Sequence, residues 1–157
     1  MSQVQTVSDA EFVPAVLAIE QALLRRGLLL ATAESCTAGW IAKVLTDRAG
    51  SSRWYEGGFV TYSNAMKQRQ LGVHEASLTA YGAVSEEVAR EMAIGAVQSS
   101  RANIALAVTG IAGPGGGSAE KPVGLVYHGL FIDAPHLDIR ECWVQRWVFD
   151  GDRVAVR

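Results

Sequence analysis

The stretch Ala31-Thr32-Ala33-Glu34-Ser35-Cys36-Thr37-Ala38-Gly39 decides how the chain is organised. It follows the apolar run 28–30, and the apolar residues of 40–45 recur at helical spacing. Small and hydroxylated residues therefore lie at a turn from a buried strand into a helix. The first N–H groups of a helix lack intrahelical partners and can stabilise an anion, so Ser35 is a candidate nucleophile. On this stretch alone, a helix cap by Ser35 or Thr37 is the favoured interpretation.

Helical and strand patterns alternate along the rest of the chain. We expect helices at about 9–26, 37–47, 64–71, 75–81 and 85–99, and strands at about 28–33, within 54–63, and at 103–109, 123–132 and 137–149. The last two strands form a hairpin. This order predicts a three-layer α/β/α sandwich whose mixed, mostly parallel sheet ends in an antiparallel hairpin.

Length and composition predict one ordinary globular domain, residues 1–157. Hydrophobic residues make up 49% and charged residues 19%, which argues against disorder. The net charge is −2 and no Lys/Arg cluster occurs, so we expect no nucleic-acid partner. No apolar run approaches the roughly 20 residues of a membrane span, and the N-terminus does not resemble a leader. We therefore expect no membrane association and a cytoplasmic location.

Metal and disulfide chemistry are not predicted. The two cysteines, Cys36 and Cys142, give neither a disulfide framework nor metal-ligand spacing. The three histidines are scattered along the chain at His74, His128 and His136. We expect no metal and no organic cofactor.

Four separated motifs resemble one known family. They are ESCTAG at 34–39, TYSNxxK at 61–67, AVSEE at 83–87, and TGIAGPGGG at 109–117 followed by KPVG. Together, in this order, they are similar to the CinA C-terminal domain family, whose stand-alone members include nicotinamide-nucleotide amidases. The match runs from about residue 28 to Arg157. Family members usually continue past this point into a last helix, so we expect that helix to be missing or very short.

The resemblance implies amide hydrolysis, which needs a nucleophile, a base and donors for an oxyanion. We expect Ser35 to be the nucleophile and Lys67 the base, since Ser–Lys pairs are a known variant and burial removes charge from lysine readily. Tyr62 is expected to relay the proton or to orient the amine, and the N–H of Cys36 or Thr37 to hold the oxyanion. The alternatives are a solvated helix lysine at 67, a core aromatic at 62, and Cys36 as the nucleophile.

The glycine-rich loop 110–118 is assigned to substrate binding, because glycine residues have no side chain and their backbone N–H groups can approach an anion closely. It matches neither GxxxxGK[ST] nor GxGxxG, and a flexible connection is the alternative. Arg153 and Arg157 are candidates for a phosphate, or else solvent-exposed. Glu34 paired with Lys67 would oppose the base, so an indirect role is preferred. The predicted binding residues are Glu34, Cys36, Thr37, Thr109, Gly110, Gly113, Gly115, Gly116, Gly117 and Arg153.

The implied reaction converts nicotinamide mononucleotide to nicotinic acid mononucleotide and ammonia. The expected partner is this small pyridine mononucleotide, and tryptophans near the C-terminus favour a homo-oligomer. Two alternatives stay open. One is a non-catalytic nucleotide-binding or regulatory module of the competence- or damage-inducible kind. The other is a serine amidase or esterase for another small substrate.

Overall fold

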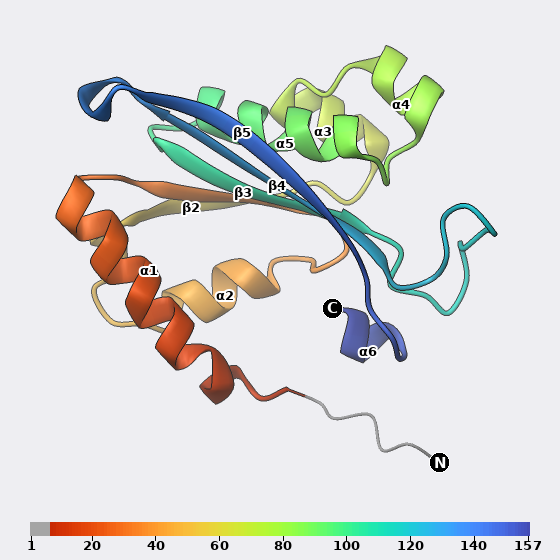
Figure 1. Cartoon of the computed structure of the whole chain (residues 1–157), viewed down its shortest axis with the longest axis horizontal. Coiled ribbons are helices and arrows are strands. Elements are labelled where there is room, and N and C mark those ends of the chain that lie inside the picture. Colours follow the sequence, from red (N-terminus) through yellow and green to blue (C-terminus); the bar gives the residue numbers. More distant parts are fainter. Residues whose placement is uncertain (1–6) are drawn as a thin grey trace.

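The computed structural model describes residues 7–157, so the first six residues of the expected domain lie outside it. A five-stranded sheet separates two layers of helices (Figure 1). The strand order is β2-β1-β3-β4-β5, with bounds Tyr55–Val60, Leu30–Glu34, Ile104–Gly110, Leu125–Ala134 and Ile139–Val148. Strands β2, β1 and β3 are parallel, while β4 runs antiparallel to β3 and to β5. The predicted three-layer fold with a mixed sheet and a terminal hairpin is confirmed.

The parallel strands end at one edge of the sheet. Glu34, the last residue of β1, pairs with Val60 of β2 on one side and with Val108 of β3 on the other. Residues that follow these strands therefore meet at the carboxyl edge, where open α/β sheets bind ligands.

One face of the sheet is covered by α3 (Asn64–Leu71), α4 (Glu75–Tyr81) and α5 (Glu86–Gln98) (Figure 1). Helix α5 begins as predicted after Ser85, whose hydroxyl accepts the N–H of Val88. Its buried stripe, which includes Val88 and Met92, packs on alanines of β1 and β3. Burial of each large apolar side chain contributes about 1.5–3 kcal/mol, so this layer fixes where α3 and α5 lie.

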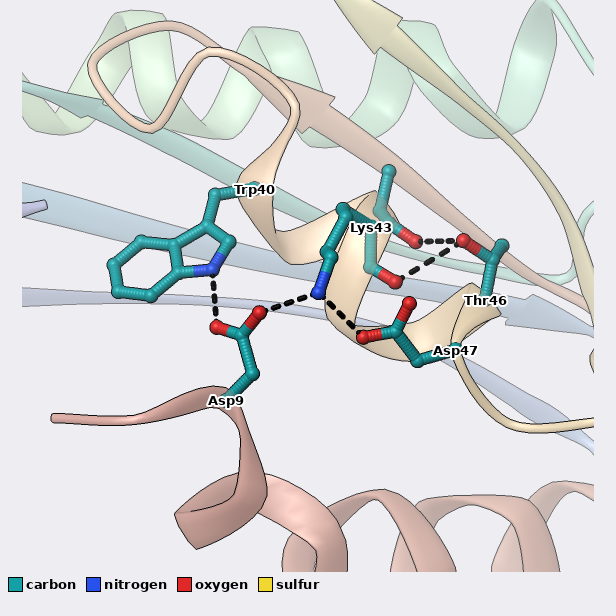
Figure 2. Close-up of polar contacts among 6 residues, drawn as sticks. Asp9, Trp40, Lys43, Thr46 and Asp47 are labelled. Carbon is teal, nitrogen blue, oxygen red and sulfur yellow. Dashed lines mark hydrogen bonds and ion pairs between the residues drawn. The ribbon is translucent and has the colours of Figure 1, made fainter.

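The other face is covered by α1 (Val13–Arg26) and α2 (Trp40–Thr46) (Figure 1). A 3₁₀ turn, η1 (Asp9–Phe12), precedes α1 and has a capping box at Ser8, and Gly27 ends α1 in the left-handed conformation. Figure 2 shows Asp9 joining this N-terminal turn to α2: its carboxylate accepts the indole N–H of Trp40 at 2.7 Å and binds the amine of Lys43.

Some element boundaries differ from the expectations. Helix α2 begins at Trp40 rather than near Thr37, because the chain turns through Ala38 and Gly39 with positive φ angles of 51° and 94°. Short 3₁₀ turns lie at η2 (Ser51–Arg53) and η3 (Pro135–Leu137). The last helix, α6 (Arg153–Val156), has four residues and is as short as expected. Within residues 7–157, no helix has the length and apolar character needed to cross a membrane.

Candidate active site

A cavity of about 300 Å³ opens at the carboxyl edge of the parallel strands. Its walls come from the segments after β1, β2 and β3, from the α4–α5 connection and from α6. A second cavity, of about 390 Å³, has mostly apolar walls that include parts of α1 and α2. The smaller cavity is the candidate active site, because Ser35 and Lys67 both line it.

The side chains of Ser35 and Lys67 meet in this cavity. Lys67 Nζ lies 2.9 Å from Ser35 Oγ and contacts the carbonyl oxygens of Thr61 at 2.8 Å and Tyr62 at 3.3 Å. A neutral amine has two N–H donors and one lone pair. Donation to the two carbonyls leaves the lone pair for the hydroxyl proton of Ser35. The same three contacts suit the ammonium form, so the amine can change charge without moving.

The environment of Lys67 favours loss of its proton. The residue is 1% exposed, and among residues 7–157 it forms no ion pair with a carboxylate. Burial lowers the pKa of Lys67 to about 8, against a smaller opposing effect of Cys36. Roughly a tenth of the amine is then neutral at pH 7. Among residues 7–157, Glu34 and Lys67 form no ion pair that would keep the amine protonated.

Ser35 lies on a tight turn between β1 and α2. Its N–H donates to Val108 O at 3.0 Å, and its carbonyl accepts the N–H of Ala38 at 3.2 Å. Within the described chain, the N–H groups of Cys36 and Thr37 donate to no backbone carbonyl outside the helices and strands. They follow Ser35 directly, so they are candidates to stabilise an oxyanion formed beside its hydroxyl.

Glu34 caps α2, a role that the sequence analysis had given to Ser35 or Thr37. Its carboxylate is 1% exposed and accepts four hydrogen bonds, from Thr37 Oγ1 at 2.7 Å and from the N–H groups of Gly39, Ile41 and Ala42 at 2.8–3.1 Å. The capping prediction was therefore wrong. Neither Glu34 nor Thr37 lines the cavity, because both side chains hold the turn instead.

Cys36 is the weaker of the two nucleophile candidates. Its side chain is buried, and burial raises the pKa of the thiol, although the N–H groups of Cys36 and Thr37 lower it to a smaller extent. Lys67 contacts the hydroxyl of Ser35 directly. The raised pKa of the Cys36 thiol and the direct contact of Lys67 with the Ser35 hydroxyl make Ser35 the stronger candidate.

Tyr62 lines the cavity in a different way from the prediction. Its carbonyl orients Lys67, but its ring is 64% exposed and its hydroxyl lies 3.4 Å from Arg153 Nη2. The contact of Tyr62 with the Lys67 amine is thus made by its backbone carbonyl. The phenol and Arg153 form the rim of the cavity.

The glycine-rich loop contributes most of its predicted members to the cavity wall, namely Gly110, Gly113, Gly115 and Gly116. A Cβ atom on Gly110 would lie 2.8 Å from the carbonyl oxygen of Leu125, so only glycine fits there. Gly117 does not line the cavity and instead packs beside Val123. Arg153 Nη1 donates to Gly113 O at 2.8 Å, whereas Arg157 turns away and donates to Thr37 O.

Two lining residues, Ala83 and Val84, were not predicted, whereas Ile111 and Ala112 line the cavity as members of the loop 110–118. Ala83 and Val84 begin the AVSEE motif, so the motif match itself was the signal that pointed to them. Among residues 7–157, no cluster of three or more His, Cys, Asp or Glu side chains is arranged to hold a metal ion.

A seryl hydroxyl is hydrogen-bonded to a buried lysine amine at the carboxyl edge of a three-layer α/β sandwich. Pairs of this kind occur in serine hydrolases of the Ser–Lys type. The chain belongs to the CinA C-terminal domain family, whose model matches residues 14–157.

The comparisons include an enzyme and a solved structure of nearly the same length. The nicotinamide-nucleotide amidohydrolase PncC of Escherichia coli strain K12 is 52% identical over 153 residues, which are 96% of this chain and 88% of the relative. The crystal structure of the competence/damage inducible protein CihA from Agrobacterium tumefaciens has a TM-score of 0.85 and 44% identity, covering 99% of this chain and 91% of that one. A CinA-like protein of Geobacter sulfurreducens is 51% identical over 140 residues, 89% of this chain and 32% of the relative.

Proposed function

We propose that this chain is a nicotinamide-nucleotide amidohydrolase, which converts nicotinamide mononucleotide to nicotinic acid mononucleotide and ammonia. The observation that carries the proposal is the 2.9 Å contact between the buried amine of Lys67 and the hydroxyl of Ser35. The 52% identity to an enzyme of that name, over nearly the whole chain, supports the substrate.

The first half of the reaction forms an acyl-enzyme. Neutral Lys67 takes the proton of Ser35 as Oγ attacks the carboxamide carbon. The N–H groups of Cys36 and Thr37 stabilise the oxyanion of the tetrahedral intermediate. When the C–N bond breaks, the Lys67 ammonium returns its proton to the leaving nitrogen, and ammonia departs.

The second half releases the acid. A water molecule loses a proton to neutral Lys67 and attacks the ester carbon on Ser35. The C–O bond to Ser35 then breaks, and Lys67 returns the proton to Oγ. Both halves use the same amine as base and then as acid, so its pKa near 8 suits both tasks at neutral pH.

The substrate phosphate is proposed to bind at the rim. Besides Lys67, Arg153 is the only Lys or Arg among the lining residues. Its guanidinium can form bidentate hydrogen bonds with a phosphate. It lies beside Gly113, in a loop where missing side chains expose backbone N–H groups. We propose Arg153 and this loop for the phosphate, and the apolar Val84 and Ile111 for the pyridine ring.

The test is ammonia release from nicotinamide mononucleotide by the wild type and by folded Ser35→Ala and Cys36→Ala variants. We expect the loss of at least about 10³-fold in kcat for Ser35→Ala and an active Cys36→Ala. A folded wild type that releases no ammonia from this substrate, but still reacts with a serine-directed fluorophosphonate, would support an amidase or esterase for another substrate. Failure of both reactions would support the nucleotide-binding module.

A single domain spanning residues 1–157, a cytoplasmic location and a homo-oligomeric state stay predictions. Exposed aromatic side chains on β5, Trp143 and Trp147, support self-association. Light scattering at several protein concentrations tests the oligomeric state.

A further inference from the structure

The α4–α5 connection forms one wall of the active-site cavity through Ala83 and Val84. Four successive carbonyl oxygens, those of residues 81–84, each accept a hydrogen bond from a side chain. One of these donors is local, since Ser85 Oγ donates to Gly82 O at 2.9 Å. The other three contacts come from β3 and from the loop that follows it.

Lys121 supplies two of the three contacts. Its amine donates to the carbonyl oxygens of Tyr81 and Val84, the latter at 2.7 Å. Its backbone is fixed by a turn in which Lys121 N–H donates to Ser118 Oγ and Ser118 N–H donates to Lys121 O. Within the described residues Lys121 forms no ion pair, so its charge acts on the two carbonyls.

Thr109 supplies the third contact. It lies near the end of β3, is buried, and donates its hydroxyl to Ala83 O at 2.8 Å. The wall is thus joined to the central sheet by Thr109 and to the connection between β3 and β4 by Lys121. Small ligands commonly lie against apolar walls while a few polar groups fix their orientation.

We propose that Lys121 and Thr109 are positioning residues that hold the Ala83–Val84 wall against the pyridine ring of the substrate. This inference rests on the proposed function. Thr109 was predicted to bind the substrate, and in this proposal it acts indirectly, by holding Ala83. Lys121 also differs in role from Arg153, because Lys121 sets the shape of the ring pocket while Arg153 is proposed for the phosphate.

Lys121→Met tests the proposal, because methionine keeps an unbranched apolar stem and removes every donor. The variant loses the two charged hydrogen bonds that hold the wall in place, and substrate binding should weaken as a result. We expect kcat/KM for nicotinamide mononucleotide to fall about 10- to 100-fold, mainly through a higher KM. Nicotinamide riboside, which lacks the phosphate, should lose affinity as a competitive inhibitor by a similar factor. If Lys121→Met weakens the binding of nicotinamide mononucleotide but not that of nicotinamide riboside, Lys121 is a phosphate ligand and the proposal is overturned.

Two further variants sharpen the test. Lys121→Arg, which keeps a charged donor, should recover part of the lost affinity. Arg140→Met, at an exposed position on β5, is the matched control and should retain wild-type KM. An equal loss in Arg140→Met and Lys121→Met would show a non-specific effect and contradict the proposal.

Hydrogen exchange separates this inference from the proposed function. In Lys121→Met and Thr109→Val we expect faster amide exchange in residues 81–88 and unchanged exchange in α1, whatever the substrate. Labelling of Ser35 by a fluorophosphonate should stay within about twofold of the wild type, since the hydrogen bonds of the Lys67 amine go to Ser35, Thr61 and Tyr62 and not to the wall. Unchanged exchange in residues 81–88 of the variants would overturn the inference even if the wild type is an active amidase. If the wild type releases no ammonia but the two variants still exchange faster in residues 81–88, only the substrate assignment is wrong.

Discussion

The amine of Lys67 lies 2.9 Å from the hydroxyl of Ser35, although 32 residues separate them in the sequence. The β1–β2 pairing brings them together, because Ser35 follows β1 and Lys67 lies on the helix after β2. The carbonyl oxygens of Thr61 and Tyr62, just after β2, then hold the amine. The parallel pairing of β1 with β2 therefore places Ser35 next to Lys67.

The pH dependence of catalysis should report Lys67. Its amine acts when neutral, and burial lowers its pKa to about 8, so protonation below that pH removes the base. We expect kcat/KM to rise with pH, to reach half its limit near pH 8 and to level off above. A profile that is flat from pH 6 to 9 would contradict a lysine base.

The stability of the protein should also depend on the charge of Lys67. Its folded pKa of about 8 lies below the unfolded value near 10.4, so the unfolded state binds more protons between these values. The free energy of unfolding of the wild type should therefore rise, relative to Lys67→Met, as the pH increases from about 8 to about 10. We expect a relative gain of about 1–3 kcal/mol by urea denaturation. Parallel pH curves for the two proteins would count against a depressed lysine pKa.

Glu34→Gln tests the turn that carries Ser35. The amide keeps one acceptor oxygen and places an NH₂ group among the N–H donors of Gly39, Ile41 and Ala42. We expect a loss of about 2–4 kcal/mol in unfolding free energy and a lower kcat as the turn loosens. The exposed Glu75→Gln on α4 is the control and should change stability by less than about 0.5 kcal/mol. Equal effects of the two substitutions would contradict the capping role.

Gly95→Ala tests the close packing of α3 against α5. A Cβ atom at Gly95 of α5 would lie 1.9 Å from the carbonyl oxygen of Leu71, the last residue of α3, so the helices must separate. We expect a loss of more than about 2 kcal/mol in stability and a reduced kcat, because α3 carries Lys67. Gln98→Ala, exposed on the same helix, should be nearly neutral. Calorimetric melting with ammonia release measures both effects, and an unchanged melting temperature in Gly95→Ala would refute this packing argument.

Much of the fold follows from local sequence signals. Ser63 and Ser85 cap α3 and α5, and Gly27 and Gly72 end α1 and α3, because the chemistry of these ends lies within a few residues. The start of α2 was misplaced, since its cap is the carboxylate of Glu34, which lies five residues before Gly39 at the end of β1. A cap that comes from the preceding strand leaves no recognisable sequence pattern at the start of the helix.

The site was predictable to the extent that motifs mark it. The sequence indicated Ser35 and Lys67, and the structure brings their side chains into contact. The exposed phenol of Tyr62 and the carbonyl contacts of Lys121 depend on how separate loops meet in space. Such contacts between loops leave no periodic pattern in either segment.

The most direct test of the central claim, that Lys67 activates Ser35, is peptide mapping after reaction with a fluorophosphonate between pH 6 and 9. We predict one adduct, on Ser35, whose rate of formation follows an ionisation near pH 8 and falls sharply in Lys67→Met. An adduct on Cys36, or labelling of Ser35 at the same rate in Lys67→Met, would contradict the account.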